Sequence, residues 1–191
     1  MQQFSKYNIF VTFKAYKHQQ MQRIRISSVI GLIFVLIFLS ACTGDQKRFR
    51  QRLINTAIEY VSKQLKNPET RILRDSTIMV GDSTKRYFIQ PSQVFSGLID
   101  EDNITDGIVT VTLMERNGSV TNEHLIILNK ENKLIMVRSV ESEMKILSVK
   151  DRVISADVPT HPATNPLHGC PVCREVKKFV FKNGDLVLKE K

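Results

Sequence analysis

The sequence has no tryptophan and only three cysteines among its 191 residues. It also lacks the short motifs of common active sites: a Gly-x-Ser-x-Gly nucleophile turn, a His-Glu-x-x-His zinc helix, a glycine-rich phosphate loop and a dinucleotide-binding fingerprint. Catalysis of these kinds therefore has no support, and we favour a protein that is not an enzyme. A hydrolase with two converging carboxylates stays open, because acids far apart in sequence can meet in a fold.

A basic stripe interleaved with aromatic side chains is also absent. The formal net charge is +9, but five of the cations lie in residues 1–41, which hold no acidic residue. The chain from residue 42 onward therefore carries only +4 and is mildly basic. This charge distribution gives no support to a nucleic-acid partner.

Residues 21–42 contain the strongest signal in the chain. Arg23 and Arg25 precede an uncharged apolar run, residues 29–41, that is shorter than the ~20 residues of a membrane-spanning helix. A basic head, a short apolar run and small residues at its end are typical of a secretory signal peptide. Met21 begins such a signal better than Met1 does, so residues 1–20 are a long leader or precede the true start.

The end of this segment, Leu39-Ser40-Ala41-Cys42, resembles the lipobox of bacterial lipoproteins. The resemblance implies that the chain is cut after Ala41 and that Cys42 carries lipid on its sulfur and becomes the acylated N-terminus. Thr43 follows where the family's inner-membrane retention signal has Asp, which implies sorting to the outer membrane in a cell with two membranes. The expected location is the bacterial cell envelope, with the lipid bilayer and an envelope protein as partners. A single transmembrane anchor is the alternative, and it would need a longer apolar run.

Once Cys42 is lipidated, Cys170 and Cys173 remain as a pair in an oxidising compartment. We favour a small structural disulfide whose loss costs ~1–3 kcal/mol. Zinc bound by these two sulfurs with His161 and His168 is the alternative, since two sulfurs and two imidazoles suit tetrahedral zinc. A redox site is disfavoured, because it needs the first cysteine at a helix N-terminus, and a proline-rich segment lies there instead.

Residues 100–107, Asp-Glu-Asp-Asn-Ile-Thr-Asp-Gly, are rich in acids. Their density resembles that of a calcium loop, but Ile104 stands where a ligand should follow Asp102. We therefore expect a solvated turn without calcium. Apart from the zinc alternative, no cofactor is expected.

Residues 46–66 show the three-to-four spacing of an amphipathic helix, with Asp45 as its cap and Asn67-Pro68 as its end. The first two turns carry four cations where the helix dipole favours acids. Because the lipid would be close by, we expect this basic cluster to face anionic lipid and orient the domain. A solvated helix face is the alternative. The cluster consists of Lys47, Arg48, Arg50 and Arg52.

From Arg71 onward the pattern changes to short strands bounded by turn residues, with the clearest alternation in residues 108–113. A proline-rich loop over residues 159–171 precedes a closing hairpin, residues 174–191, that turns at Asn183-Gly184. We expect one α+β domain over residues 46–191, after a signal peptide (1–41) and a short tether (42–45). Its helix should pack on an antiparallel sheet of about six or seven strands. Cystatin-like and nuclear-transport-factor-like folds share this order as a fold-level analogy only.

These observations favour a membrane-anchored binding or assembly module of the cell envelope. The alternative class is a metal- or thiol-handling envelope protein that uses the Cys-x-x-Cys motif and its nearby histidines. A hydrolase of unfamiliar type is a more remote alternative. His124 begins a strand, and we expect it at the surface or the edge of the core.

Overall fold

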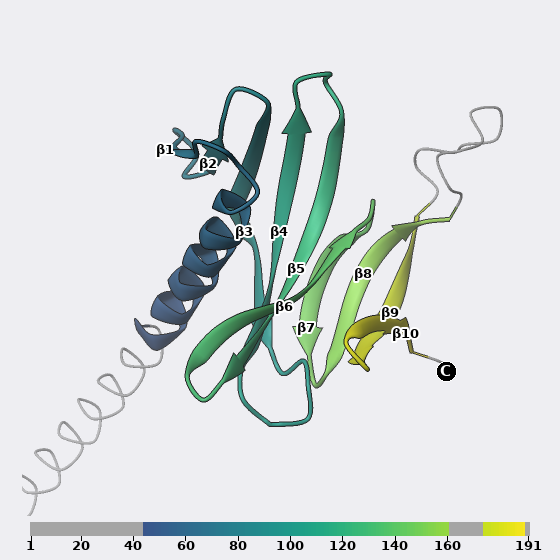
Figure 1. Cartoon of the computed structure of the whole chain (residues 1–191). Helices are drawn as coiled ribbons and strands as arrows, with labels where there is room; N and C mark the ends of the chain where they lie inside the picture. The colour runs from purple at the N-terminus through teal and green to yellow at the C-terminus, as the bar shows by residue number, and fades with distance from the viewer. Residues whose placement is uncertain (1–43, 161–173, 190–191) are drawn as a thin grey trace, which may run out of the picture. The chain divides into compact units, whose positions relative to one another are not determined.

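The computed structural model describes residues 44–160 and 174–189. Contacts divide the chain into two compact units, Met1–Lys47 and Arg48–Lys191, and the fold described below is that of the second unit. The described residues form one helix and ten antiparallel strands in two sheets (Figure 1). Sheet A runs in the order β1 Glu69–Ile72, β2 Ile78–Gly81, β3 Lys85–Gly97, β4 Asp106–Glu115, β5 Val120–Lys130 and β6 Lys133–Glu141. Sheet B runs in the order β10 Asp185–Leu188, β9 Arg174–Lys182, β8 Val153–Pro159 and β7 Lys145–Lys150.

Sheet A is covered on both faces. Odd-numbered positions of β4 and β5, such as Val109 and Leu125, join a core with the helix residues Leu53 and Ala57. Even-numbered positions, such as Ile108 and Ile126, join a second core with the buried residues of β7 and β8. Residues 125–128 are therefore apolar without interruption, as expected for a strand that is buried on both faces.

The predicted helix against an antiparallel sheet is confirmed, whereas the expectation of a single sheet is wrong. The C-terminal strands form a second sheet, because the continuous apolar run in β5 requires cover on two sides. The predicted closing hairpin is confirmed, with Asn183 and Gly184 both at positive φ in its turn.

The helix occupies residues 44–62 of the described chain, so its bounds differ from those predicted. Asp45 lies within the helix and is not its cap, and residues 44–45 do not belong to an extended tether. The helix ends before Lys66, whose backbone N–H donates to Asp82 Oδ2 over 3.2 Å. Leu53, Ile54, Ala57 and Val61 form its buried face, as the amphipathic spacing indicates.

Strand β3 is one long element of 13 residues with an irregularity in its middle. Its pairing with β4 moves from Ile89 opposite Val111 to Val94 opposite Val109, so residues 90–93 lie across from Thr110 alone. Pro91 lies inside this bulge, where it has no backbone N–H to donate to a neighbouring strand. The bulge therefore interrupts the pairing of β3 with β4 at the middle of β4.

Gly97 allows the end of β3 to approach β7 closely. A Cβ atom at this position would lie 2.5 Å from the backbone oxygen of Val149, which cannot move without shifting its strand. We expect Gly97→Ala to lower the free energy of unfolding by about 1–3 kcal/mol, as for other overpacked sites. Urea unfolding measures this loss, and Gly44→Ala serves as the control because nothing lies within 4 Å of its added Cβ. Equal midpoints for Gly97→Ala and wild type would contradict the close packing.

Candidate functional site

Polar side chains interrupt the apolar interface between the two sheets. On the face of sheet A that meets sheet B, Ile108 pairs with Ile126 at one end of β4 and β5. Toward the other end, Thr110 pairs with His124 and Thr112 pairs with Asn122. The Thr112 hydroxyl donates to Asn122 Oδ1 over 2.8 Å. One half of this face is therefore a core, and the other half presents hydroxyl, amide and imidazole groups.

These polar groups border a cleft of about 340 Å³, which we call the polar cleft. It lies beside the β3 bulge, which supplies Gln90 and Gln93 to its wall. Within the described chain, neither glutamine amide has a hydrogen-bond partner. Each amide therefore keeps two N–H donors and one oxygen acceptor free. The other lining residues are Thr110, Thr112 and Asn122 of sheet A, with Glu143, Met144, Lys145, Asp157 and Arg174 on the side of sheet B.

His124 lies directly behind the wall of the polar cleft and is completely buried. Its Nδ1 is 3.0 Å from Thr110 Oγ1, while its Nε2 has no hydrogen-bond partner among the described residues. Burial lowers the pKa of His124, and the nearby backbone of Met144 and Ser142 opposes this shift in part. The neutral imidazole is therefore favoured at neutral pH, and it fixes the position of the Thr110 hydroxyl.

The prediction of a surface or core-edge position for His124 is wrong. Alternating polar residues in β4 and β5 looked like the solvent face of half-buried strands. Sheet B covers that face, so the same residues became a polar lining between two sheets. Without the second sheet, the sequence pattern could not reveal the polar cleft.

On the sheet B side of the polar cleft, Arg174 and Asp157 form an ion pair, whereas Glu143 and Lys145 have no ion pair among the described residues. Arg174 Nε donates to Asp157 Oδ2 over 2.8 Å, and its Nη2 donates to the backbone oxygens of Glu143 and Asp157. The guanidinium and carboxylate therefore neutralise each other at this edge. The wall formed by sheet A holds only uncharged donors and acceptors. Such a wall suits a ligand that is polar but uncharged, with hydroxyl or amide groups.

The acid-rich turn is more ordered than the sequence indicated. Candidate ligand atoms of Asp100, Asp102 and Asp106 lie within 4.8 Å of one another, the only such group of three in the described ranges 44–160 and 174–189. Lys130 Nζ lies 2.5 Å from Asp100 and 2.6 Å from Asp102, so an ammonium group already neutralises two of the carboxylates. Residues 101–105 are exposed, as expected for a solvated turn, whereas Asp106 at the start of β4 is fully buried. Burial raises the pKa of Asp106, although backbone N–H groups that donate to it oppose the shift.

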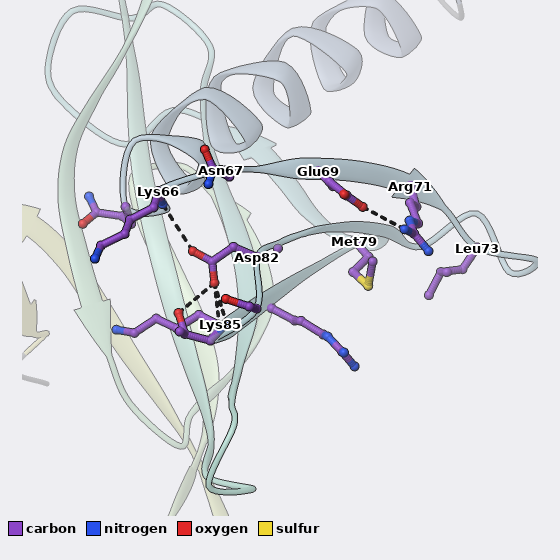
Figure 2. Close-up of a pocket in the computed structure, with 13 residues that line it drawn as sticks. Lys66, Asn67, Glu69, Arg71, Leu73, Met79, Asp82 and Lys85 are labelled. Carbon is purple, nitrogen blue, oxygen red and sulfur yellow. Dashed lines mark hydrogen bonds and ion pairs between the residues drawn. The ribbon is translucent and has the colours of Figure 1, made fainter.

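A wide hollow of about 840 Å³ lies between the helix end and strands β1 to β3. Figure 2 shows Asp82 at its centre, bonded to its own turn. The Thr84 hydroxyl and the backbone N–H groups of Thr84, Lys85 and Lys66 donate to this carboxylate, and they hold the pKa of Asp82 well below its usual value. Because its central charge stabilises the local turn, we assign the polar cleft rather than this hollow as the candidate site.

The residues singled out from the sequence have different positions. Cys42, His161, His168, Cys170 and Cys173 lie outside the described residues, so the lipid, disulfide and zinc assignments stay predictions. Of the basic cluster, Lys47, Arg48 and Arg50 are exposed on the helix. Arg52 is also exposed, but its Nη2 donates to the Asn132 backbone oxygen over 2.5 Å. Arg52 therefore holds the helix to the turn between β5 and β6.

Comparison with known proteins found no matching family model, no matching curated protein and no matching solved structure. Across residues 44–160 and 174–189, no helix has both the length and the apolar character that a membrane crossing requires.

Proposed function

We propose that this protein is a lipid-anchored binding module of the bacterial cell envelope, and that the polar cleft binds its ligand. The observation that carries the proposal is the cleft itself, where the β3 bulge exposes unpaired glutamine amides between two sheets. Bulges commonly occur beside functional sites, where they redirect side chains away from a regular ladder. A few convergent polar groups in a concave site are also typical of ligand recognition.

The anchoring half of the proposal comes from the lipobox resemblance at Cys42. Acylated Cys42 holds the module at the membrane, with the outer membrane as the proposed destination. Lys47, Arg48 and Arg50 then face anionic headgroups, while Arg52 stabilises the fold through Asn132. The helix on sheet A keeps the cystatin-like or nuclear-transport-factor-like order as a proposed fold analogy, which carries no function.

The polar cleft is proposed to take an uncharged ligand rich in hydroxyl and amide groups, and N,N′-diacetylchitobiose is a suitable probe. We expect its addition to the mature protein to shift the side-chain amide resonances of Gln90 and Gln93 in a nitrogen–proton NMR spectrum. Gln93→Leu should weaken binding about 2- to 10-fold, the effect of one lost neutral hydrogen bond. Gln51→Leu is the matched control, because Gln51 lies exposed on the helix and bonds only to Asn55. Shifts confined to residues outside the polar cleft would contradict the assignment.

A further inference from the structure

A second hollow, which we call the tyrosine hollow, lies on the opposite face of sheet A, at the end of the helix. Its volume is about 400 Å³. Tyr60 of the helix and Tyr87 of β3 line it, together with three glutamates and one lysine from neighbouring strands. These charged residues are Glu115 of β4, Glu123 of β5, Glu141 of β6 and Lys85 of β3. The hollow thus combines two phenol groups with an excess of negative charge.

Two of the carboxylates in the tyrosine hollow oppose each other directly. Glu123 and Glu141 are register partners in the antiparallel pair of β5 and β6, where like charges are destabilising. Lys85 Nζ lies 3.4 Å from a carboxylate oxygen of Glu115, so the lysine neutralises one of the three glutamates. Glu123 accepts a hydrogen bond from Ser139 over 3.0 Å, but no described cation pairs with Glu123 or Glu141. The pair places negative charge beside the hollow, where a bound cation would relieve the repulsion.

Tyr87 provides an independent indication of a ligand. Its side chain is 3 % exposed and lines the tyrosine hollow, yet its hydroxyl has no hydrogen-bond partner in the described part of the chain. Burial raises the pKa of Tyr87, and the nearby Glu123, Tyr60 and Glu115 raise it further, which places its phenol beside these groups. The enclosed side-chain atoms without a partner in the described residues are those of His124 and Asn129, so the Tyr87 hydroxyl is not sealed in the core. It opens onto the tyrosine hollow, where a bound group can become its partner.

We propose that the tyrosine hollow binds a primary ammonium group, as carried by a lysine side chain or a small alkylamine. An ammonium has three N–H donors, which match the carboxylates of Glu123 and Glu141 and the oxygen of Tyr87. Hydrogen bonds between charged partners are the stronger kind, and the faces of aromatic rings also attract cations. The tyrosine hollow is thus a cation site on the helix side of sheet A, separate from the polar cleft on the other side.

The chain carries its own reporter for this site. It has no tryptophan and four tyrosines, of which Tyr7 and Tyr16 precede the cleavage point after Ala41. In the mature protein, the remaining tyrosines are Tyr60 and Tyr87, and both line the tyrosine hollow. A group bound there should therefore change the tyrosine fluorescence of the whole mature protein.

The test titrates the mature acylated protein, held in nanodiscs, with Nα-acetyl-lysine N-methylamide while tyrosine fluorescence and heat of binding are recorded. The norleucine analogue is the neutral control, because it keeps the length of the side chain and lacks the ammonium. We expect the capped lysine to bind at least about 10-fold more tightly than the capped norleucine. Glu123→Gln and Tyr87→Phe should each weaken it, the first by about 10-fold. Glu175→Gln, an exposed change on β9, should leave binding unchanged.

Butylammonium separates the two sources of the ammonium group. Tighter binding of capped lysine than of butylammonium indicates a peptide or protein partner, and the reverse order indicates a free amine. Thermal unfolding shows whether the variants are folded. Glu123→Gln should raise the midpoint of unfolding by about 1–2 °C, because it removes the repulsion with Glu141. The proposal is overturned if lysine and norleucine bind equally, if neither produces heat or a fluorescence change, or if both hollow variants bind like wild type.

Discussion

Replacing Asp106 by alanine should lower the free energy of unfolding by about 3–5 kcal/mol, among the largest losses expected for one side chain in this fold. Asp106 is fully buried, and its Oδ1 accepts the Asn129 N–H over 2.8 Å. Its Oδ2 accepts the Ile99 N–H over 3.1 Å and, more weakly, the Asp100 N–H over 3.4 Å. Alanine would leave the two buried donors, those of Ile99 and Asn129, without a partner, at about 1–3 kcal/mol each.

Urea unfolding of the mature protein measures this loss. Glu101→Ala in the same turn is the control, because its side chain is exposed and its replacement should change stability by less than about 0.5 kcal/mol. Asp106→Asn keeps one acceptor oxygen and should fall between the two variants. A loss below about 1 kcal/mol for Asp106→Ala would show that water reaches the freed N–H groups and that the carboxylate does not hold the turn.

Asp106 also illustrates what the sequence could not reveal. Four acids within eight residues resemble a solvated turn, because composition does not distinguish an acid that caps backbone groups from one that faces water. The distinction depends on β5, whose Asn129 N–H lies 23 residues away in sequence. Lys130, which neutralises Asp100 and Asp102, comes from the same distant strand. Local sequence patterns contain no information about such pairings.

The local features of the fold were accessible from sequence. The spacing of Leu53, Ala57 and Val61 predicted the helix face, and Asn183-Gly184 predicted the last turn. The turn at Asp151-Arg152 was missed, because arginine at positive φ is unusual and gives no turn signal. Contacts formed by Arg152 offset that strain: its Nε donates to the Asp100 backbone oxygen over 2.9 Å, and its Nη2 donates to Asn103 Oδ1 over 2.7 Å.

The polar cleft shows the same division between local and distant information. The pairing of β3 with β4 resumes after four residues opposite Thr110, and no local pattern in the sequence predicts this. The cleft exists only because β7 and β8 return to cover β4 and β5. The sequence therefore shows that the residues of the polar cleft are polar. It does not show that they lie together, because that depends on the packing of the helix, sheet A and sheet B in three layers.

The anchoring proposal leads to the largest expected effect on the whole protein, which is the loss of its lipid in Cys42→Ser. The lipobox resemblance implies that the sulfur of Cys42 is acylated before the chain is cut, and a serine hydroxyl does not replace that thiol. We expect an uncut precursor that takes up no labelled palmitate, detected by gel mobility and by the label. The control is the double variant Cys170→Ser and Cys173→Ser, which should be cut and labelled normally because Cys42 remains. Since each buried CH₂ of an acyl chain contributes ~0.8 kcal/mol to membrane binding, the lipid and not the basic helix face should determine retention. A Cys42→Ser protein that is cut and labelled like wild type would contradict the assignment of Cys42 as the lipidated residue.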